Sequence, residues 1–151
     1  MKAAVRYQSR GGNTRAVAEA IASALGIQAE SIGAPITEKV DVLFVGGGVY
    51  AWDADKRLTA WLKDIDRDNV GEIAAFGTAG GMSSVITRVQ RIAAEIGIPV
   101  NAHTLMLKML HRGYALLGMH GGNLTDAQKE KSAHFAMDVT ADWEKRHNQT
   151  R

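Results

Sequence analysis

Short apolar runs alternate with amphipathic segments along almost the whole chain. The runs have the length of strands and lie at residues 2–7, 27–32, 42–45 and 73–76 and within residues 100–108. The run at 42–45, Val-Leu-Phe-Val, has no polar position, which is typical of a central parallel strand covered on both faces. The run at 27–32 carries Gln28 and Glu30 and is therefore predicted to lie at the edge of a sheet.

Four other segments place apolar side chains three and four positions apart, which is the spacing of one face of a helix. The core-facing positions are Val17, Ala20, Ile21, Ala24 and Leu25; Leu58, Trp61, Leu62 and Ile65; Val85, Val89, Ile92, Ala93 and Ile96; and Ser132, Phe135, Ala136, Val139 and Trp143. Gly97 and Pro99 are predicted to end the third helix, and Thr125 with Asp126 to begin the fourth. Residues 33–39 leave room for about two turns of helix or an irregular crossover.

Five strands that alternate with helices predict an α/β protein. Its parallel sheet would have five strands and helices on both faces, which makes a three-layer sandwich with right-handed crossovers. The length of 151 residues and the hydrophobic fraction of 46% fit a single domain over residues 1–151. No internal repeat or low-complexity segment indicates a linker.

Composition argues against several classes of function. The chain has no cysteine, so disulfides, thiolate nucleophiles and cysteine-ligated iron–sulfur clusters are excluded, and the cytosol is a compatible compartment. No apolar segment approaches the roughly 20 residues that a membrane span needs, and the N-terminus does not have the pattern of a signal peptide. A formal charge of +2 without a dense basic patch argues against a nucleic-acid partner. We therefore expect a cytoplasmic protein.

The stretch Ser9-Arg10-Gly11-Gly12-Asn13-Thr14 joins the first strand to the first helix and has the chemistry of an anion site. Its glycines allow a close approach of backbone N–H groups, its hydroxyls can donate hydrogen bonds, and the helix N-terminus adds a positive dipole end. Arg10 adds a positive charge that could pair with a phosphate. Taken alone, a plain turn capped by Asn13 or Thr14 explains the same residues. The stretch matches neither of the two best-known phosphate-loop motifs.

Two more glycine-rich segments, residues 46–53 and 77–84, follow the third and fourth predicted strands as loops. Ligands of open parallel sheets bind beyond the carboxyl ends of the strands, where the strand order reverses. Three segments of small residues at that edge favour one shared flat ligand that carries a phosphate.

With these segments in these places, the chain resembles short-chain flavodoxins over essentially its whole length. The phosphate loop of that family runs hydroxyl-x-hydroxyl-Gly-x-hydroxyl, which Ser9, Gly12 and Thr14 match, while Gly11 replaces the middle hydroxyl. The resemblance implies a flavodoxin-like fold with strand order 2-1-3-4-5 and FMN as the cofactor. It also implies that the FMN phosphate is held by Ser9, Arg10, Gly11, Gly12, Asn13 and Thr14. The missing hydroxyl should cost about 1 kcal/mol of binding.

The resemblance further implies that the flavin ring lies against the second and third loops. The implied contacts are Gly47, Gly48, Val49, Tyr50, Ala51, Trp52, Thr78, Ala79, Gly80 and Gly81. Tyr50 falls where flavodoxins commonly place a stacking aromatic and Trp52 is nearby, although packing in the core is the alternative for both. Ala51 replaces a glycine that many flavodoxins have, and a left-handed backbone there would cost about 1 kcal/mol more. The third loop lacks the family's acidic residue and second tyrosine, so backbone amides would make most of its contacts.

Residues 106–123 mix Met, Leu, Tyr, His and Arg without a carboxylate. They are either the end of the last strand with a loop packed on the sheet, or a lid or docking patch beside the flavin. His103, His111 and His120 are irregularly spaced and have no carboxylate nearby, so we expect no metal site. We find no convincing catalytic acid, base or nucleophile.

The resemblance implies an FMN-binding flavodoxin, a small electron-transfer protein that works between a reductase and an acceptor protein. The alternative is a flavin-dependent oxidoreductase that acts directly on a quinone or a porphyrinogen-type substrate. Residues 46–50, Gly-Gly-Gly-x-Tyr, also look like a loop of flavodoxin-like menaquinone-dependent protoporphyrinogen oxidases. A phospho-acceptor receiver domain shares the topology but needs carboxylates at the strand ends, where Tyr7 and Gly46 stand instead.

Overall fold

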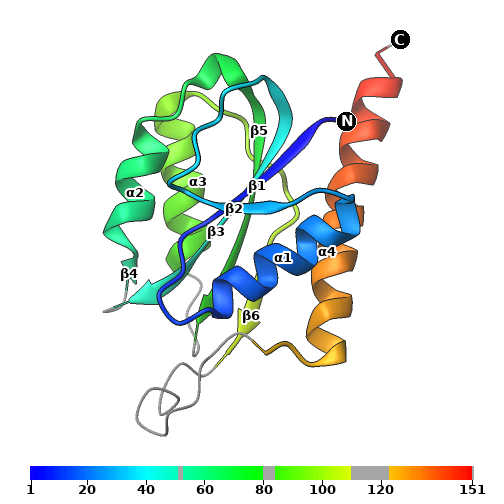
Figure 1. The fold of residues 1–151 in the computed structure, drawn as a ribbon. Helices are drawn as coiled ribbons and strands as arrows, with labels where there is room; N and C mark the ends of the chain where they lie inside the picture. The colour runs from blue at the N-terminus through cyan, green and yellow to red at the C-terminus, as the bar shows by residue number, and fades with distance from the viewer. Residues whose placement is uncertain (51–52, 80–83, 110–122, 151) are drawn as a thin grey trace, which may run out of the picture.

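The protein is built on a central sheet of five parallel strands (Figure 1). A computed structural model describes residues 1–50, 53–79, 84–109 and 123–150. The parallel strands are β1 (Ala3–Tyr7), β2 (Ala29–Ser31), β3 (Val40–Tyr50), β5 (Val70–Ala79) and β6 (Leu105–Lys108). Their order is β2-β1-β3-β5-β6, and every pairing along this path is parallel. The predicted α/β class and the predicted order 2-1-3-4-5 are therefore confirmed.

A short strand that the sequence did not predict, β4 (Asp53–Ala54), folds back on the end of β3. Val49 pairs with Ala54 and Tyr50 with Asp53, both in antiparallel fashion. The hairpin lies at the carboxyl end of β3, outside the parallel path, and so leaves the predicted topology unchanged.

The helices cover both faces of the sheet (Figure 1). One face carries α1 (Asn13–Leu25) and α4 (Asp126–Asn148), and the other carries α2 (Lys56–Lys63) and α3 (Ser84–Ile96). A 3-10 turn, Arg67–Asn69, leads into β5. Among the described residues, none of the helices has both the length and the apolar character needed to cross a bilayer.

Successive residues of β3 supply the two cores on opposite faces of the sheet, as the pleat of a strand requires. Val42 and Phe44 belong to the core beneath α1 and α4. There the Phe44 and Phe135 rings pack edge to face, with their centroids 5.7 Å apart. Leu43 and Val45 belong to the core beneath α2 and α3. All four β3 side chains are fully buried, which confirms the prediction of a strand covered on both faces.

The crossover from β2 to β3 is irregular, which is one of the two predicted outcomes. Residues 32–39 contain no helix, and the buried side chain of Arg6 holds them by hydrogen bonds to backbone carbonyls. Its Nε donates to the Ala34 oxygen at 3.0 Å, and one Nη donates to the Pro35 oxygen at 3.2 Å. A guanidinium with several donors thus satisfies carbonyls that a helix would otherwise pair.

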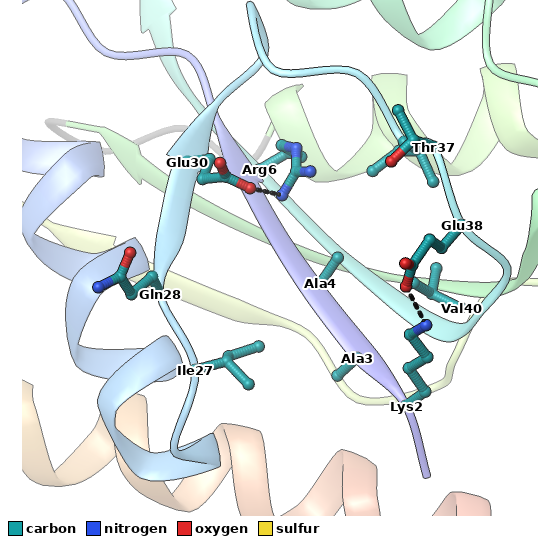
Figure 2. Close-up of a pocket in the computed structure, with 11 residues that line it drawn as sticks. Lys2, Ala3, Ala4, Arg6, Ile27, Gln28, Glu30, Thr37, Glu38 and Val40 are labelled. Carbon is teal, nitrogen blue, oxygen red and sulfur yellow. Dashed lines mark hydrogen bonds and ion pairs between the residues drawn. The ribbon is translucent and has the colours of Figure 1, made fainter.

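A cavity of about 190 Å³ lies between β1, β2 and this crossover (Figure 2). The charged side chains that line it pair with one another, Arg6 with Glu30 at 3.0 Å and Lys2 with Glu38. The charges of this cavity are therefore satisfied within the protein, and we assign it no ligand.

The glycine-rich ends of β3 and β5 are strand, so the prediction that residues 46–48 and 77–79 are loops is wrong. The parallel ladder continues through Gly46 opposite Phe76, Gly47 opposite Gly77, and Gly48 opposite Thr78. The glycines are there because neighbouring side chains occupy the space that a Cβ would need. A Cβ on Gly46 would lie 2.0 Å from the Phe76 ring, and one on Gly77 would lie 2.2 Å from a Val85 methyl group.

The remaining predicted boundaries hold within a few residues. β2 is shorter than predicted but is the edge strand, because it pairs with β1 alone along the described path. Helix α2 ends at Lys63, so Ile65 lies outside it, although Ile65 still packs against the α2–α3 core. Gly97 follows α3 with a left-handed φ of 81° and confirms the predicted end. Thr125 caps α4 in a capping box with Gln128, as predicted.

Replacing Gly46 with alanine should destabilise the protein by about 1–3 kcal/mol, because the new methyl group overlaps the buried Phe76 ring. Gly33→Ala is the matched control, since a Cβ there meets only the Ser31 hydroxyl at 3.4 Å. Urea unfolding followed by tryptophan fluorescence measures both variants. Equal stability of the two variants would show that the Phe76 ring does not close over Gly46.

Candidate cofactor site at the carboxyl edge of the sheet

The carboxyl ends of the parallel strands meet at one edge of the sheet, at the foot of Figure 1. The chain leaving β1 remains next to β3, since the Gln8 N–H donates to the Gly46 oxygen at 3.0 Å. The chain leaving β6 remains next to β5, since the Met109 N–H donates to the Ala79 oxygen at 3.0 Å. The first loop and the ends of β3, β5 and β6 therefore form one continuous edge.

The first loop turns directly into α1 through a left-handed glycine. Gly12 has a φ of 94° and its oxygen accepts the first helical hydrogen bond, from Ala16 at 3.0 Å. Its N–H donates to the Ser9 hydroxyl oxygen at 3.1 Å, which fixes the shape of the loop. Asn13 and Thr14 are buried in the first turn of α1, and no side chain caps the helix. The alternative that Asn13 or Thr14 caps this turn is therefore wrong, because the left-handed glycine places the helix start one residue earlier.

This helix start has the donor set that an anion needs. The N–H groups of a first helical turn have no partner within the helix, and the dipole is positive there. The first turn of α1 contains no acidic residue, and within the described part of the chain its N-cap, Gly12, makes no side-chain cap hydrogen bond. The residues present therefore fit a phosphate group.

A buried pair of hydroxyl groups connects the first loop to the end of β5. Thr14 Oγ1 and Thr78 Oγ1 are 2.8 Å apart, and both residues are almost fully buried. One hydroxyl donates to the other, and the accepting hydroxyl keeps its own proton for a further acceptor. Thr14 can therefore donate to a ligand when Thr78 donates to Thr14. No local sequence pattern indicates this pair, because its members are 64 positions apart.

An ion pair connects the first loop to the start of α2. The Arg10 Nε lies 2.8 Å from Asp55 Oδ2, and the Asp55 side chain has no exposed surface. Asp55 Oδ1 accepts from the Arg57 N–H at 2.8 Å and so caps α2. Arg10, predicted to pair with a phosphate, thus contacts a carboxylate of the protein. The neighbouring acid Asp53 lies in β4.

Asp55 is ionised at neutral pH despite its burial. Burial opposes the charge, but the Arg57 N–H and the Arg10 guanidinium outweigh it and hold the pKa of the Asp55 carboxyl below its ordinary value. Arg10 therefore compensates a buried negative charge next to the anion-binding loop.

The structure brings the predicted phosphate loop together with parts of the predicted ring-binding loops. Gly47 and Gly48 are buried in β3, and Thr78 and Ala79 are buried in β5. Gly47 also has a packing role, since a Cβ there would lie 2.6 Å from a Leu58 methyl group. The backbone of Val49 and Tyr50 continues β3. The side chains of Val49 and Tyr50, and the whole of Ala51, Trp52, Gly80 and Gly81, lie outside the described residues.

The stretch 106–123 is described only at its two ends. Residues 106–108 belong to β6, as in the first of the two alternatives, and Asn123 leads into α4. Residues 110–122, which include His111 and His120, lie outside the described part. Within that part, no group of three or more acidic, histidine or cysteine side chains could hold a metal ion.

Comparisons with known proteins agree with this geometry. No protein-family model matches the chain, and no curated protein matches it. Among solved structures, a flavodoxin from the domain Archaea superposes with a TM-score of 0.75 at 19% identity, over 95% of this chain and 99% of that one. The rubredoxin oxygen:oxidoreductase of the anaerobe Desulfovibrio gigas gives a TM-score of 0.73 at 15% identity, over 95% of this chain and 36% of that one. An NADH:FMN oxidoreductase, EmoB, gives a TM-score of 0.53 at 15% identity, over 91% of this chain and 90% of that one.

The strand order and the helices on both faces define a doubly wound α/β protein. The superpositions make the fold more specific: the chain has the flavodoxin-like fold. It spans about a third of the Desulfovibrio gigas enzyme, which contains much else besides this fold.

Replacing Asp55 with asparagine should lower the free energy of unfolding by about 1–2 kcal/mol at pH 7, because a buried charge-assisted pair is lost. The pKa of Asp55 is below its ordinary value of 3.8, so this contribution is complete above pH 3.8 and fades as the pH falls further. Chemical unfolding of both proteins from pH 7 to pH 3 measures the difference.

The control for this prediction is Glu19→Gln, which removes a carboxylate from the exposed Arg15–Glu19 pair. Water screens that pair, so its loss should leave the stability almost unchanged. Two results would contradict a stabilising role of the Arg10–Asp55 pair. One is a loss of unfolding free energy in Asp55→Asn that is as small as in the control variant, and the other is a loss that is the same at pH 3 as at pH 7.

Proposed function

We propose that the chain binds FMN and acts as a small electron-transfer protein between redox partner proteins. The observation that carries the proposal is the uncapped, acid-free start of α1 behind Gly12, tied by the Thr14–Thr78 pair to the end of β5. An anion site and the ends of two central strands thus face one ligand. A structural neighbour over almost its full length is named a flavodoxin, which supports the proposal at the level of fold.

The phosphate of FMN would be held by residues 9–14. The backbone N–H groups of the first turn of α1 donate to it, and the dipole of α1 favours its charge. The Ser9 oxygen accepts from Gly12, so the Ser9 proton remains for a phosphate oxygen. Arg10 acts here by compensating Asp55, which would otherwise repel the phosphate across a poorly solvated site.

The flavin ring would lie at the ends of β3 and β5. The proposal places the ring against the backbone of Gly47, Gly48, Thr78 and Ala79, and it extends to Val49, Ala51, Gly80 and Gly81. Tyr50 and Trp52 are proposed to cover the ring. Bound FMN supplies the capacity to accept and release electrons, while the protein positions it and excludes water from it.

A direct flavin enzyme is the second candidate function. A structural neighbour that aligns over 90% of its own chain is named an NADH:FMN oxidoreductase, which supports a flavin enzyme as the second candidate. A quinone or a porphyrinogen-type compound would then be the substrate. Turnover of such a compound without any partner protein would favour the enzyme, and strict dependence on a partner reductase would favour the carrier.

The visible spectrum of the purified protein tests the central proposal. We expect a yellow protein whose released cofactor is FMN. The apoprotein should bind FMN at least about tenfold more tightly than riboflavin, because only FMN has the phosphate that residues 9–14 would bind. A protein that stays colourless after incubation with FMN would refute the proposal.

Replacing Thr14 with valine should weaken FMN binding about tenfold and leave riboflavin binding almost unchanged, because the lost hydroxyl is proposed to donate to the phosphate. The matched control is Thr140→Val on α4, where the hydroxyl donates to the Ala136 oxygen far from this edge. Fluorescence titration of each apoprotein measures both ligands. If Thr14→Val lost the same factor of affinity for riboflavin as for FMN, Thr14 would not contact the phosphate.

A further inference from the structure

Exposed basic side chains flank the part of the carboxyl edge where the flavin ring is proposed to lie. Lys56 and Arg57 begin α2, directly after the β4 hairpin that folds onto the end of β3. Lys108 ends β6 and pairs in register with Ala79 at the end of β5. All three basic side chains are exposed. We call these three residues the basic rim.

Two described carboxylates near the rim pair with basic side chains outside it. Asp55 is buried and paired with Arg10, although it also attracts the charge of Arg57, and Glu19 is paired with Arg15. The start of α4 carries acids and lysines in alternation, so its charges offset one another.

The opposite edge of the sheet has a different charge pattern. Exposed acids lie in the last turn of α3, after α2 and before β3, at Glu38, Asp64, Asp66, Asp68 and Glu95. Exposed basic side chains lie among them, at Lys2, Lys39, Lys63, Arg67 and Lys145. The opposite edge is therefore of mixed charge, whereas the three residues of the rim are all basic.

We propose that the basic rim docks an acidic face of a redox partner protein, an inference that rests on the proposed function. Electron transfer requires the partner to approach the exposed edge of the flavin, and the side chains at that approach determine which surface potential is attractive. The phosphate of FMN would lie at the start of α1, where the helix dipole offsets part of its charge.

Charge reversal at the two opposite edges of the sheet gives a matched test. Lys56→Glu/Lys108→Glu reverses two rim charges, and Lys63→Glu/Lys145→Glu makes the same net change near the opposite edge, at the last turns of α2 and α4. The FMN-loaded proteins are reduced and mixed in stopped flow with a small acidic iron–sulfur protein, and separately with a basic c-type cytochrome. The salt concentration is varied from about 20 to about 300 mM, over which the Debye length falls from about 20 Å to about 6 Å.

The wild-type rate with the acidic partner should fall about tenfold over this range, whereas the rate with the basic partner should rise or stay constant. With the acidic partner, the rate of the rim variant should be about tenfold below that of wild type at low salt and should not depend on salt. The rate of the control variant should stay within about twofold of wild type. A rate with the acidic partner that rises with salt, or an equal loss in both variants, would overturn the inference.

A second measurement needs no bound flavin. Amide NMR spectra of the chain with hexacyanochromate(III), a paramagnetic trianion, should show broadening around residues 56, 57 and 108 as well as around the anion site at residues 9–14, and the rim variant should lose only the broadening at the rim. Broadening concentrated at the opposite edge would overturn the inference. If the chain fails to bind FMN but shows the NMR broadening at the rim, the proposed function alone is refuted. If the chain binds FMN but its rate with the acidic partner does not fall with salt, the docking inference alone is refuted.

Discussion

The close approach of side chains over the glycines of β3 and β5 is the constraint on which the carboxyl edge depends. Phe76 closes over Gly46, while Val85 occupies the space beside Gly77. Since no Cβ intervenes, Leu58 of α2 and Val85 of α3 lie close to Gly47 and Gly77, and the parallel ladder continues to Gly48 opposite Thr78. The candidate site is therefore built partly on strands, which are held more rigidly than loops.

Two polar contacts then fix the first loop relative to the strand ends. The Thr14–Thr78 pair joins the loop to β5, and the Arg10–Asp55 pair joins it to the start of α2. Both have a member with almost no exposed surface, so water competes poorly with them. A ligand that contacts all three segments would find them already in place and would lose less free energy to ordering them.

Much of the fold is predictable from the sequence, because hydrophobic periodicity records which faces are buried. The uninterrupted run in β3 and the apolar stripes of the four helices lead to the observed layers, and the resemblance of Ser9, Gly12 and Thr14 to a known phosphate loop leads to the strand order. The glycines at 46–48 misled the prediction, because a glycine required by a neighbouring ring looks the same in sequence as a glycine required by a turn. The Arg10–Asp55 pair leaves no local pattern, since 45 positions separate its members.

The direction of the helices reinforces the charge pattern of the carboxyl edge. Helices α1, α2 and α3 begin at this edge, because each follows the carboxyl end of a strand or hairpin and runs antiparallel to the sheet. Their positive dipole ends therefore point to the same side as Lys56, Arg57 and Lys108. A ligand or partner at this edge experiences a field that a net charge of +2 does not reveal. The relevant electrostatic quantity for binding here is accordingly the local potential, to which backbone and side chains contribute with the same sign.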